Sequence, residues 1–254
     1  MMRVTLLGTG SSTGTPQLLC DCPVCLSADP RNRRTRFAIL LETAQTTLLI
    51  DTPFEIRLQL LAAGVKRLDA LWLTHDHSDH FAGIDDLRIF SFRNKAPIPL
   101  YALPSVIAAA RDRFKYLFDE NEYSDINFLD PRPVTADGPV PCGDLTLTPL
   151  YHRHGQSAMA SFRTGDFAFI ADISEIAPEE LGKLRRLDTL VISCTVKHDH
   201  YKHMKLDDIL VLIQRIAPRR AILTHMNHRF DHEELLRTLP AGVEPGYDGM
   251  VVEL

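Results

Sequence analysis

Four side chains that can bind metal lie within six residues, in the run Thr74-His75-Asp76-His77-Ser78-Asp79-His80. Two imidazoles two residues apart in an extended or turning segment can face one ion. The Asp79-His80 pair that follows can reach a second ion close by, so that both ions share one water molecule. A solvated histidine-rich turn is the alternative, but four ligands at this spacing favour a dinuclear metal site.

Strands and helices must position these side chains. Short apolar runs that end in a polar residue or glycine predict buried strands. We expect strands at 4–7, 47–50, 71–73, 145–150, 167–170, 190–192 and 221–223. We expect helices at 54–63, 105–114, 178–184 and 206–216. Candidate ligands follow several of these strands, at places where a rigid sheet can hold loop side chains.

The bulk composition is that of an ordinary globular protein. The chain has 254 residues, enough to bury a proper core, and a net charge of −5. That charge argues against a protein that coats nucleic acid but not against a small anionic substrate. No apolar run approaches the ~20 residues of a membrane helix, and the N-terminus reaches Gly8 too soon for a signal peptide. We therefore expect a cytoplasmic protein without a membrane partner.

Three of the five cysteines lie in the run Cys20-Asp21-Cys22-Pro23-Val24-Cys25. Thiolates this close together are poor candidates for disulfides with one another and good ligands for one Zn²⁺. Cys20, Cys22 and Cys25 leave one tetrahedral position open, and His228 is the candidate to fill it. A closed Cys₃His set would be structural. A redox-active C-x-x-C pair is the alternative, but no thioredoxin-like strand and helix surround it.

The run His75-x-His77-x-Asp79-His80 matches the signature of metallo-β-lactamase-fold hydrolases, and the resemblance extends beyond it. In that family a lone histidine, an aspartate at a strand end and a final histidine complete the site. This sequence offers His154, Asp172 and His225, each after an apolar run. The resemblance implies one domain over residues 1–254, an α/β fold in which two mixed β-sheets flanked by helices form an αββα sandwich.

The same resemblance divides the ligands between two divalent ions and adds one shared ligand. The first set is His75, His77 and His154, the second set is Asp79, His80 and His225, and the bridging ligand is Asp172. Imidazole and carboxylate ligands suit several metals, so zinc and manganese both remain open.

Three further polar residues, His152, Asp76 and Asp51, lie near these candidate ligands in the sequence. Strand alternation places His152 and His154 on the same side, so periodicity cannot separate them. We favour His154, because the glycine after it and Phe162 eight residues later resemble the family pattern. Asp76 more readily forms a local hydrogen bond, or acts on the surroundings of the water, than binds metal. Asp51 is, by resemblance, an acceptor for a ligand imidazole, and a plain turn aspartate is equally consistent.

The cysteine run narrows the resemblance to the PhnP-type phosphodiesterases, which carry a structural zinc beside the dinuclear centre. Further matching motifs cover nearly the whole chain: Thr9-Gly10-Ser11-Ser12-x-Gly14-x-Pro16, Leu223-Thr224-His225-x-x-His228-x-Phe230-Asp231 and Gly246-Tyr247-Asp248-Gly249-Met250. The resemblance suggests a homodimer.

This narrower resemblance implies a metal-dependent phosphodiesterase. Its substrate would be a small cyclic phosphodiester, such as phosphoribosyl 1,2-cyclic phosphate or a 2′,3′-cyclic nucleotide, attacked by a hydroxide that bridges the two metals. The catalytic residues implied are Asp79, among the ligands, and His203, which matches a histidine just before a helix. An imidazole pKa of ~6.5 suits proton transfer to the leaving oxygen. His198 and His200 in the same segment are alternatives.

Other functions use the same signature. The tRNA 3′-processing endonucleases of the ribonuclease Z type share the dinuclear site, but the chain has no Gly/Pro-rich basic insertion to grip tRNA. We therefore expect no stable nucleic-acid complex. Thioester and lactam hydrolases of the same superfamily are a second alternative. A zinc-binding interaction protein without activity is a third, and the complete set of seven ligands argues against it.

Overall fold

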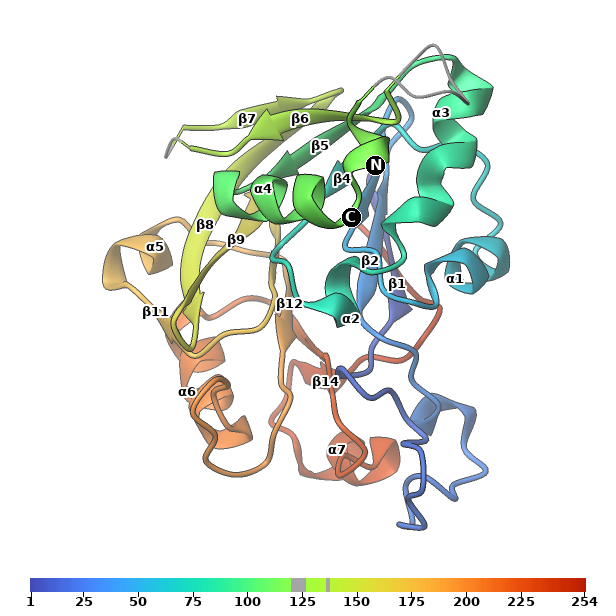
Figure 1. The fold of residues 1–254 in the computed structure, drawn as a ribbon. Coiled ribbons are helices and arrows are strands. Elements are labelled where there is room, and N and C mark those ends of the chain that lie inside the picture. Colours follow the sequence, from blue (N-terminus) through green and yellow to red (C-terminus); the bar gives the residue numbers. More distant parts are fainter. Residues whose placement is uncertain (120–126, 136–137) are drawn as a thin grey trace.

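The computed structural model describes residues 1–119, 127–135 and 138–254, and these form two β-sheets that pack face to face with helices outside them (Figure 1). The first sheet has the order β15 (Met250–Glu253), β1 (Arg3–Gly8), β2 (Ala38–Glu42), β3 (Thr47–Ile50), β4 (Ala70–Trp72), β5 (Ile98–Ala102) and β6 (Leu129–Pro133). Its pairs are antiparallel from β15 to β3 and parallel from β3 to β6.

The second sheet repeats this mixed pattern. Its order is β11 (Glu175–Ile176), β8 (Leu145–His154), β9 (Ser157–Thr164), β10 (Phe167–Ile170), β12 (Thr189–Ser193), β13 (Arg220–Thr224) and β14 (Val243–Pro245), with β7 (Val140–Cys142) paired to β8. The pairs are antiparallel from β11 to β10 and parallel from β10 to β14. In each sheet the parallel strands end at one edge, where ligands commonly bind in α/β proteins.

Three apolar layers hold the sandwich together. The central layer lies between the sheets and includes Ile39, Trp72 and Phe162. The Trp72 indole also donates a 2.8 Å hydrogen bond to the carbonyl of Ala160 in the other sheet. Two outer layers join the sheets to helices on their far sides. The predicted αββα sandwich of two mixed sheets is therefore confirmed.

The helices divide between the two outer faces (Figure 1). Over the first sheet lie α1 (Ile56–Ala62), α2 (Ser78–Phe81), α3 (Arg88–Asn94) and α4 (Pro104–Arg113), and over the second lie α5 (Pro178–Gly182), α6 (Leu206–Ile216) and α7 (His232–Thr238). Short 3₁₀ turns are η1 (Pro30–Asn32), η2 (Ile84–Leu87) and η3 (Lys115–Leu117). Among the described residues, none of the helices combines the length and apolar character needed to cross a membrane.

Helix α6 shows how the sequence sets these elements. Ile209, Leu212, Ile213 and Ile216 recur at helical spacing and are buried against the second sheet. Two aspartates occupy the first turn, where their negative charges interact favourably with the positive end of the helix dipole. The helix ends at Ile216, and its C-cap residue Ala217 takes a left-handed conformation with φ +52°.

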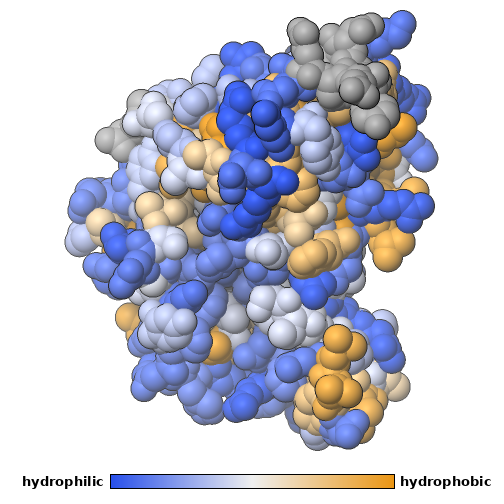
Figure 2. All heavy atoms as spheres, viewed as in Figure 1, coloured by the Kyte–Doolittle hydropathy of each residue, from blue (hydrophilic) through white to orange (hydrophobic). Residues whose placement is uncertain are grey.

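A long loop between β1 and β2 projects from the sandwich and carries the cysteine run (Figure 1). The face of the molecule seen in the space-filling view is mostly hydrophilic, with an apolar cluster on this loop at the lower right (Figure 2). Leu18, Leu19 and Leu26 of the loop are exposed. Backbone hydrogen bonds join its base to the segment after β13, from Met226 to Thr9 and from Ser11 to Met226.

Candidate metal centre

The histidine motif begins two residues beyond β4 and turns into the short helix α2. His77 lies at the N-cap of α2 in extended backbone, so His75 and His77 lie in the loop while Asp79 and His80 lie in the helix. The carboxylate of Asp51, which follows β3, accepts hydrogen bonds from the amide and the hydroxyl of Thr74 and so holds Thr74 in place. The neighbouring parallel strands β3 and β4 therefore bring Asp51 under the motif.

The seven candidate ligands form two groups with their ligand atoms within 4.8 Å of one another. One group is His75, His77, His154 and Asp172, and the other is Asp79, His80 and His225. This grouping matches the one implied by the family resemblance, with Asp172 contributing to the first.

Asp172, just beyond β10, lies between the two groups. Its Oδ2 is 3.9 Å from His75 Nε2 and 3.8 Å from His154 Nε2 in the first group. The same oxygen is 3.6 Å from His80 Nε2 in the second. This position suits a carboxylate that bridges two ions, as expected for Asp172.

Hydrogen bonds on the outer side of the imidazoles fix their orientation. His80 Nδ1 donates to Asp51 Oδ2 at 2.7 Å, and His154 Nδ1 donates to the carbonyl of Lys202 at 2.9 Å. His75 Nδ1 lies 3.0 Å from the Thr74 hydroxyl, which gives its own proton to Asp51 and so accepts from the ring. These bonds leave the Nε2 lone pairs directed inward, as ligand histidines require.

The inward atoms fit a pair of cations. The buried Nε2 of His75 has no hydrogen-bond partner among the described residues. His80 Nε2 and His225 Nε2 lie 3.0 Å apart. Two lone pairs at that distance repel unless a proton or a metal ion lies between them. The donor set of five imidazoles and two carboxylates therefore fits divalent ions of the zinc or manganese type.

The ionisation states favour metal binding as well. Burial lowers the pKa values of His75 and His154, so both rings are neutral near pH 7, as ligands must be. For Asp172, burial acts upward on the pKa, but the charges of His225 and His80 hold it well below its ordinary value. Burial acts downward on the pKa of His80, but Asp51 and Asp172 raise it well above the ordinary value. A bound cation would take the place of that His80 proton.

The structure separates His152 from His154. Both side chains are buried in β8, which extends four residues beyond the predicted strand end at 150. His152 Nε2 lies 2.8 Å from the hydroxyl of Ser161 on β9, and burial lowers its pKa to about 4. Only His154 of these two joins a group of ligand atoms.

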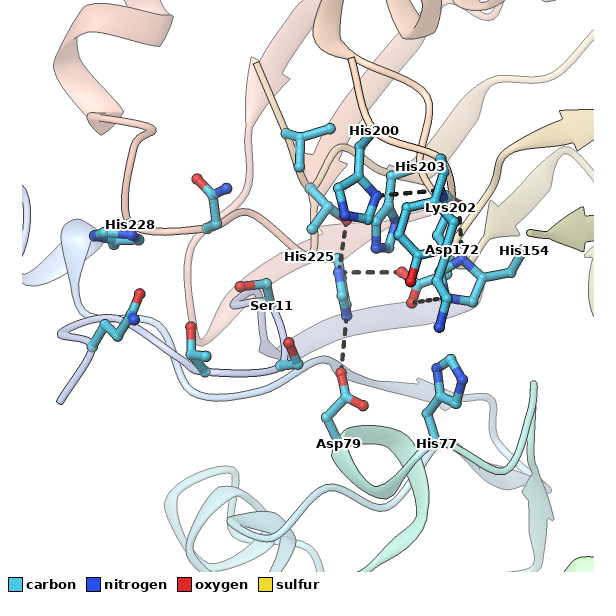
Figure 3. Close-up of a pocket in the computed structure, with 17 residues that line it drawn as sticks. Ser11, His77, Asp79, His154, Asp172, His200, Lys202, His203, His225 and His228 are labelled. Carbon is cyan, nitrogen blue, oxygen red and sulfur yellow. Dashed lines mark hydrogen bonds and ion pairs between the residues drawn. The ribbon is translucent and has the colours of Figure 1, made fainter. Parts of the chain in front are cut away.

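The segment after β12 supplies the histidines considered for proton transfer. The ring of His203 lies 4.6 Å from that of His154 and lines the cavity above the metal centre (Figure 3). His200 also lines the cavity, with its ring 5.1 Å from that of His203. His198 is exposed and does not line this cavity. Burial lowers the pKa of His203 to about 3, well below the value that its residue type alone predicts.

Asp76 belongs to neither ligand group. Its carbonyl and carboxylate accept hydrogen bonds of 2.6 and 3.2 Å from Arg113 at the end of α4. Arg113 also lies over the ring of Phe81. Asp76 therefore fastens the motif loop to α4 through a residue 37 positions away, and not through the local hydrogen bond expected from the sequence.

A cavity of about 390 Å³ opens above the ligands. One wall comes from the loop after β1 and includes Ser11, Ser12 and Gln17, and Asn227 adds an amide. The other wall is the segment 200–203 (Figure 3). The floor is formed by ligands of both groups, so a molecule bound in the cavity would contact the metal centre directly.

Sequence reasoning missed several residues that hold the ligands in place. The Thr195 hydroxyl lies 2.9 Å from His225 Nδ1. Thr195 comes two residues after β12, whose last residue pairs with the last residue of the parallel neighbour β13. The rule that placed His225 at a strand end would also have placed Thr195 there. The Lys202 carbonyl that holds His154 is a backbone group, and its residue type gives no signal for this role.

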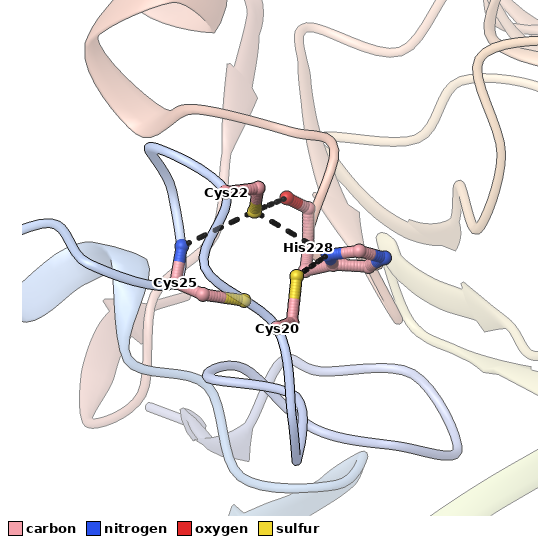
Figure 4. Close-up of side chains that lie close together, drawn as sticks. All are labelled: Cys20, Cys22, Cys25 and His228. Atoms are coloured by element: carbon pink, nitrogen blue, oxygen red, sulfur yellow. Dashed lines mark hydrogen bonds between the residues drawn. The ribbon is translucent and has the colours of Figure 1, made fainter.

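Cys20, Cys22, Cys25 and His228 form a third cluster, with their ligand atoms also within 4.8 Å of one another (Figure 4). His228 Nδ1 lies 3.2 Å from Cys20 Sγ and 3.4 Å from Cys22 Sγ. A backbone hydrogen bond from Cys25 and the contact with His228 lower the pKa of Cys22 to about 6, while burial raises that of Cys25 to about 11. A cation at their centre would favour the thiolate of both. The structure thus brings together the residues of the predicted Cys₃His set.

Comparison with known proteins agrees with this architecture. Residues 46–226 match the family model described as a beta-lactamase superfamily domain. A solved structure described as a new diphosphatase from the PhnP family superposes with a TM-score of 0.93 at 32% identity, covering 100% of this chain and 98% of that one.

Two proteins with related sequences have names that differ from that of the PhnP-family structure. The chain is 36% identical over 252 residues, 98% of its length, to an octanoyltransferase of Porphyromonas gingivalis, but it spans only 51% of that protein. A ribonuclease Z of Mycobacterium sp. (strain KMS) is 34% identical over 110 residues, which are 41% of this chain and 33% of that protein. The chain thus spans about half or less of these curated relatives, whose names describe longer proteins.

Together, the sandwich and its two ligand groups define a metal-dependent hydrolase of the metallo-β-lactamase fold. The chain belongs to the beta-lactamase superfamily, and within it the chain is PhnP-like.

Proposed function

We propose that this chain hydrolyses small phosphodiesters, with cyclic ones such as phosphoribosyl 1,2-cyclic phosphate or a 2′,3′-cyclic nucleotide as the candidate substrates. The observation that carries the proposal is the position of Asp172, whose carboxylate lies between two ligand groups at the floor of a polar cavity of about 390 Å³. The likeness to a PhnP-family diphosphatase over the whole chain supports phosphorus chemistry there.

Two divalent ions bound by these seven ligands would supply a hydroxide nucleophile at neutral pH and neutralise charge that grows on the phosphoryl oxygens. Zinc and manganese both fit the donor set. The chain's own contribution is to fix the ligand rings through Asp51, Thr74 and the Lys202 carbonyl. Rigid support of this kind holds reacting groups in the geometry that the reaction needs.

His203 is the candidate for the proton that the leaving oxygen must receive. It lines the cavity beside His154, within reach of a group bound at the floor. Because burial holds its pKa at about 3, the ring is neutral when the cavity is empty. An anionic phosphoryl group beside the ring would raise that pKa and favour the imidazolium that donates the proton.

We propose that the Cys₃His cluster binds one structural zinc. Its four ligands would leave no position for substrate. Cys20, Cys22 and Cys25 come from the projecting loop, whereas His228 comes from the segment after β13. A metal there would fasten the loop to the segment that carries His225 and Asn227. It would therefore hold one wall of the cavity against the metal centre.

Processing of tRNA 3′ ends, as in ribonuclease Z, is the second candidate function, and it has less support. The match to the mycobacterial ribonuclease Z covers 41% of the chain, whereas the PhnP-family structure covers all of it. The net charge of −5 also disfavours a surface for tRNA. The cytoplasmic location and the homodimer expected from the sequence stay predictions.

A substrate panel tests the proposed function. Metal-loaded protein is assayed with bis-p-nitrophenyl phosphate, 2′,3′-cyclic nucleotides, phosphoribosyl 1,2-cyclic phosphate, a thioester, a lactam and a precursor tRNA, once with manganese and once with zinc. We expect turnover of at least one small diester, with kcat/KM well above that for the thioester and the lactam. Cleavage of the tRNA alone, or of the thioester or lactam alone, would contradict the proposal.

A further inference from the structure

Helix α1 presents apolar side chains to solvent, where a surface helix usually presents polar ones. Leu58 and Leu61 of this helix are 61% and 64% exposed, whereas the polar residue Gln59 is buried. Ile89 of α3 is also 64% exposed. Single exposed apolar residues are common on protein surfaces, but a group of them marks an interaction site. We therefore looked for a hollow that joins the exposed residues of α1 and α3.

A groove of about 410 Å³ lies between α1 and α3, and Leu61 and Ile89 belong to its walls. Its other apolar lining residues are Leu60 of α1, Val65 beyond the end of α1, and Phe90 of α3. We call this hollow the α1–α3 groove. Both helices lie on the outer face of the first sheet (Figure 1). Among the described residues, the groove and the cavity above the metal centre share no lining residue, so the groove is a separate feature.

Positive charge surrounds the apolar walls of the α1–α3 groove. Three cations that form no ion pair with any described residue line it: Arg57, Lys66 and Arg93. Asp86 is the one carboxylate among the described lining residues. By contrast, Arg88, which precedes Ile89 in α3, pairs with Asp85 at 2.8 Å. Because the whole chain carries a net charge of −5, the excess of positive charge is local to this groove.

An acidic amphipathic helix has the chemistry that fits these walls. Such helices lay an apolar face into a hydrophobic groove, with anchoring side chains three or four residues apart. The apolar walls would receive the anchors, and acidic side chains beside the anchors would reach the three cations. Burial of Leu61 and Ile89 would supply hydrophobic free energy. The cations would set the orientation of the helix and disfavour basic partners.

Two other occupants of the groove fit less well. A second copy of the chain in a two-fold contact would place the same three cations on both sides of the interface, where they repel one another. An anionic membrane attracts basic clusters, but the net charge of −5 opposes the approach of the chain as a whole. A groove between two helices also encloses a third helix better than it meets a flat lipid surface.

We propose that the α1–α3 groove binds an acidic amphipathic helix of a partner protein. The groove lies outside the metal centre, so this inference does not depend on the proposed hydrolase function. The homodimer expected from the sequence would use another face of the molecule. The test below measures binding and not turnover, so failure of the docking site and failure of the proposed function are distinguishable.

Peptide binding to the full chain tests the chemistry of the groove. The probe is a fluorescent helical peptide of about 18 residues, or five turns, with leucines three and four positions apart and glutamates elsewhere. A lysine version replaces each glutamate, and a scrambled version keeps the composition but has no apolar face. Binding is measured by fluorescence anisotropy. We expect a Kd on the order of 10 μM for the glutamate peptide and about tenfold weaker binding, or less, for the other two.

Variants of the groove test its apolar and its charged parts separately. Leu61→Ser and Ile89→Ser each remove an anchoring contact and should weaken binding of the glutamate peptide about tenfold. Arg57→Glu combined with Arg93→Glu should reverse the preference, so that the lysine peptide binds more tightly than the glutamate peptide. Leu61 and Ile89 are exposed, so their serine variants should keep the fold, and melting curves check this.

Leu236→Ser and Arg185→Glu are the matched controls. Leu236 is 45% exposed on α7, which covers the second sheet. Arg185 follows α5 and is exposed, without an ion pair to any residue that the structure describes. Each control makes the same kind of change as a groove variant on the other outer face. Both should leave binding of the glutamate peptide unchanged.

Several results would overturn the docking site. Equal binding of the glutamate and scrambled peptides would do so, as would unchanged binding in Leu61→Ser. Light scattering after size-exclusion chromatography tests the second copy: a wild-type dimer that Leu61→Ser converts to a monomer would assign the groove to that copy instead. Sedimentation with vesicles of phosphatidylcholine and phosphatidylserine tests the membrane: vesicle binding that Leu61→Ser abolishes would assign the groove to lipid instead.

Discussion

His80 Nε2 and His225 Nε2 lie 3.0 Å apart, although the two residues are 145 positions apart in the chain. His80 is held from behind by Asp51 of the first sheet, and His225 by Thr195 of the second. The contact therefore joins the carboxyl edges of the parallel strands of both sheets. In the metal-free chain the proton of His80 joins the two nitrogens, and a bound cation would take its place and tie the two halves of the sandwich together.

Asp79→Ala should remove a ligand of the second ion and abolish diester turnover. The expected loss in kcat/KM is on the order of 10³-fold, since a catalytic metal contributes several kcal/mol to transition-state stabilisation. Turnover of bis-p-nitrophenyl phosphate and the circular dichroism melting curve are measured together. Asp79 lies near the surface of the site, with its side chain 14% exposed, so the fold should persist.

The matched control for that variant is Asp76→Ala, three residues earlier in the motif. Its carboxylate bonds Arg113 rather than a ligand. We expect less than a tenfold change in turnover. If Asp76→Ala lost as much turnover as Asp79→Ala, the assignment of Asp79 and not Asp76 as a metal ligand would be contradicted.

Asp51→Asn should weaken metal binding without removing a ligand. The buried carboxylate accepts the proton of His80 Nδ1, and partners of this kind typically account for about 10- to 100-fold in metal affinity. Asparagine is the suitable replacement because Asp51 has φ +62°, a conformation that Asn tolerates. Competition with a chromophoric chelator measures the affinity. Unchanged affinity would show that Asp51 does not support metal binding through His80.

Cys22→Ser should lose one zinc per chain and lower the melting temperature. A metal that binds only the folded state at 100 times its Kd stabilises the protein by about 2.7 kcal/mol. For a chain of this size that energy corresponds to a fall on the order of 5–10 °C. Metal content by mass spectrometry and calorimetric melting measure both effects.

Cys142→Ser provides the comparison for the cysteine variant. Cys142 is buried on β7 and belongs to none of the ligand clusters found among the described residues. Its serine variant should keep all of the bound zinc. Equal zinc content in Cys22→Ser and Cys142→Ser would rule out the structural site.

The stability of the metal-free protein should depend on His152 in mildly acidic solution. Burial lowers the pKa of His152 to about 4 in the folded chain, against about 6.5 in an unfolded one. The unfolded state therefore binds a proton first as the pH falls. His152 thus costs stability progressively from about pH 6.5 down to pH 4, by about 3 kcal/mol in total.

His152→Gln should remove this loss. Glutamine can keep a hydrogen bond to Ser161 but does not titrate. Urea unfolding of metal-stripped wild type and variant at pH 7 and pH 4.5 should show a smaller loss of stability in the variant. Identical pH dependence in both proteins would mean that His152 is not buried as a neutral ring.

Much of the fold and site could be predicted because strand ends carry the ligands. The strands at 47–50 and 167–170 have their predicted bounds, and the residues that follow include Asp51 and Asp172. Helix α6 was predicted with its observed bounds, because its apolar spacing and the following proline are strong local signals. Apolar runs that end in a polar residue, together with the family resemblance, were enough to select all seven candidate ligands that the structure brings together.

Other features depend on contacts that a sequence pattern does not contain. Helix α7 was not predicted, because it begins at His232 with a charged run and buries little apolar surface. The role of Lys202 in holding His154 belongs to its carbonyl and could not follow from the side chain. The lowered pKa of His203 follows from its burial in the folded chain, which a sequence pattern does not show.

Metal titration of turnover tests the central claim most directly. Protein stripped of its exchangeable metal, with the Cys₃His zinc retained, is titrated with Mn²⁺ or Zn²⁺, and bis-p-nitrophenyl phosphate turnover is followed against bound metal. We expect negligible turnover without added metal, and a plateau at two ions per chain beyond the zinc of the Cys₃His cluster. Full turnover without the added ions, or two bound ions without turnover of any small diester, would contradict it.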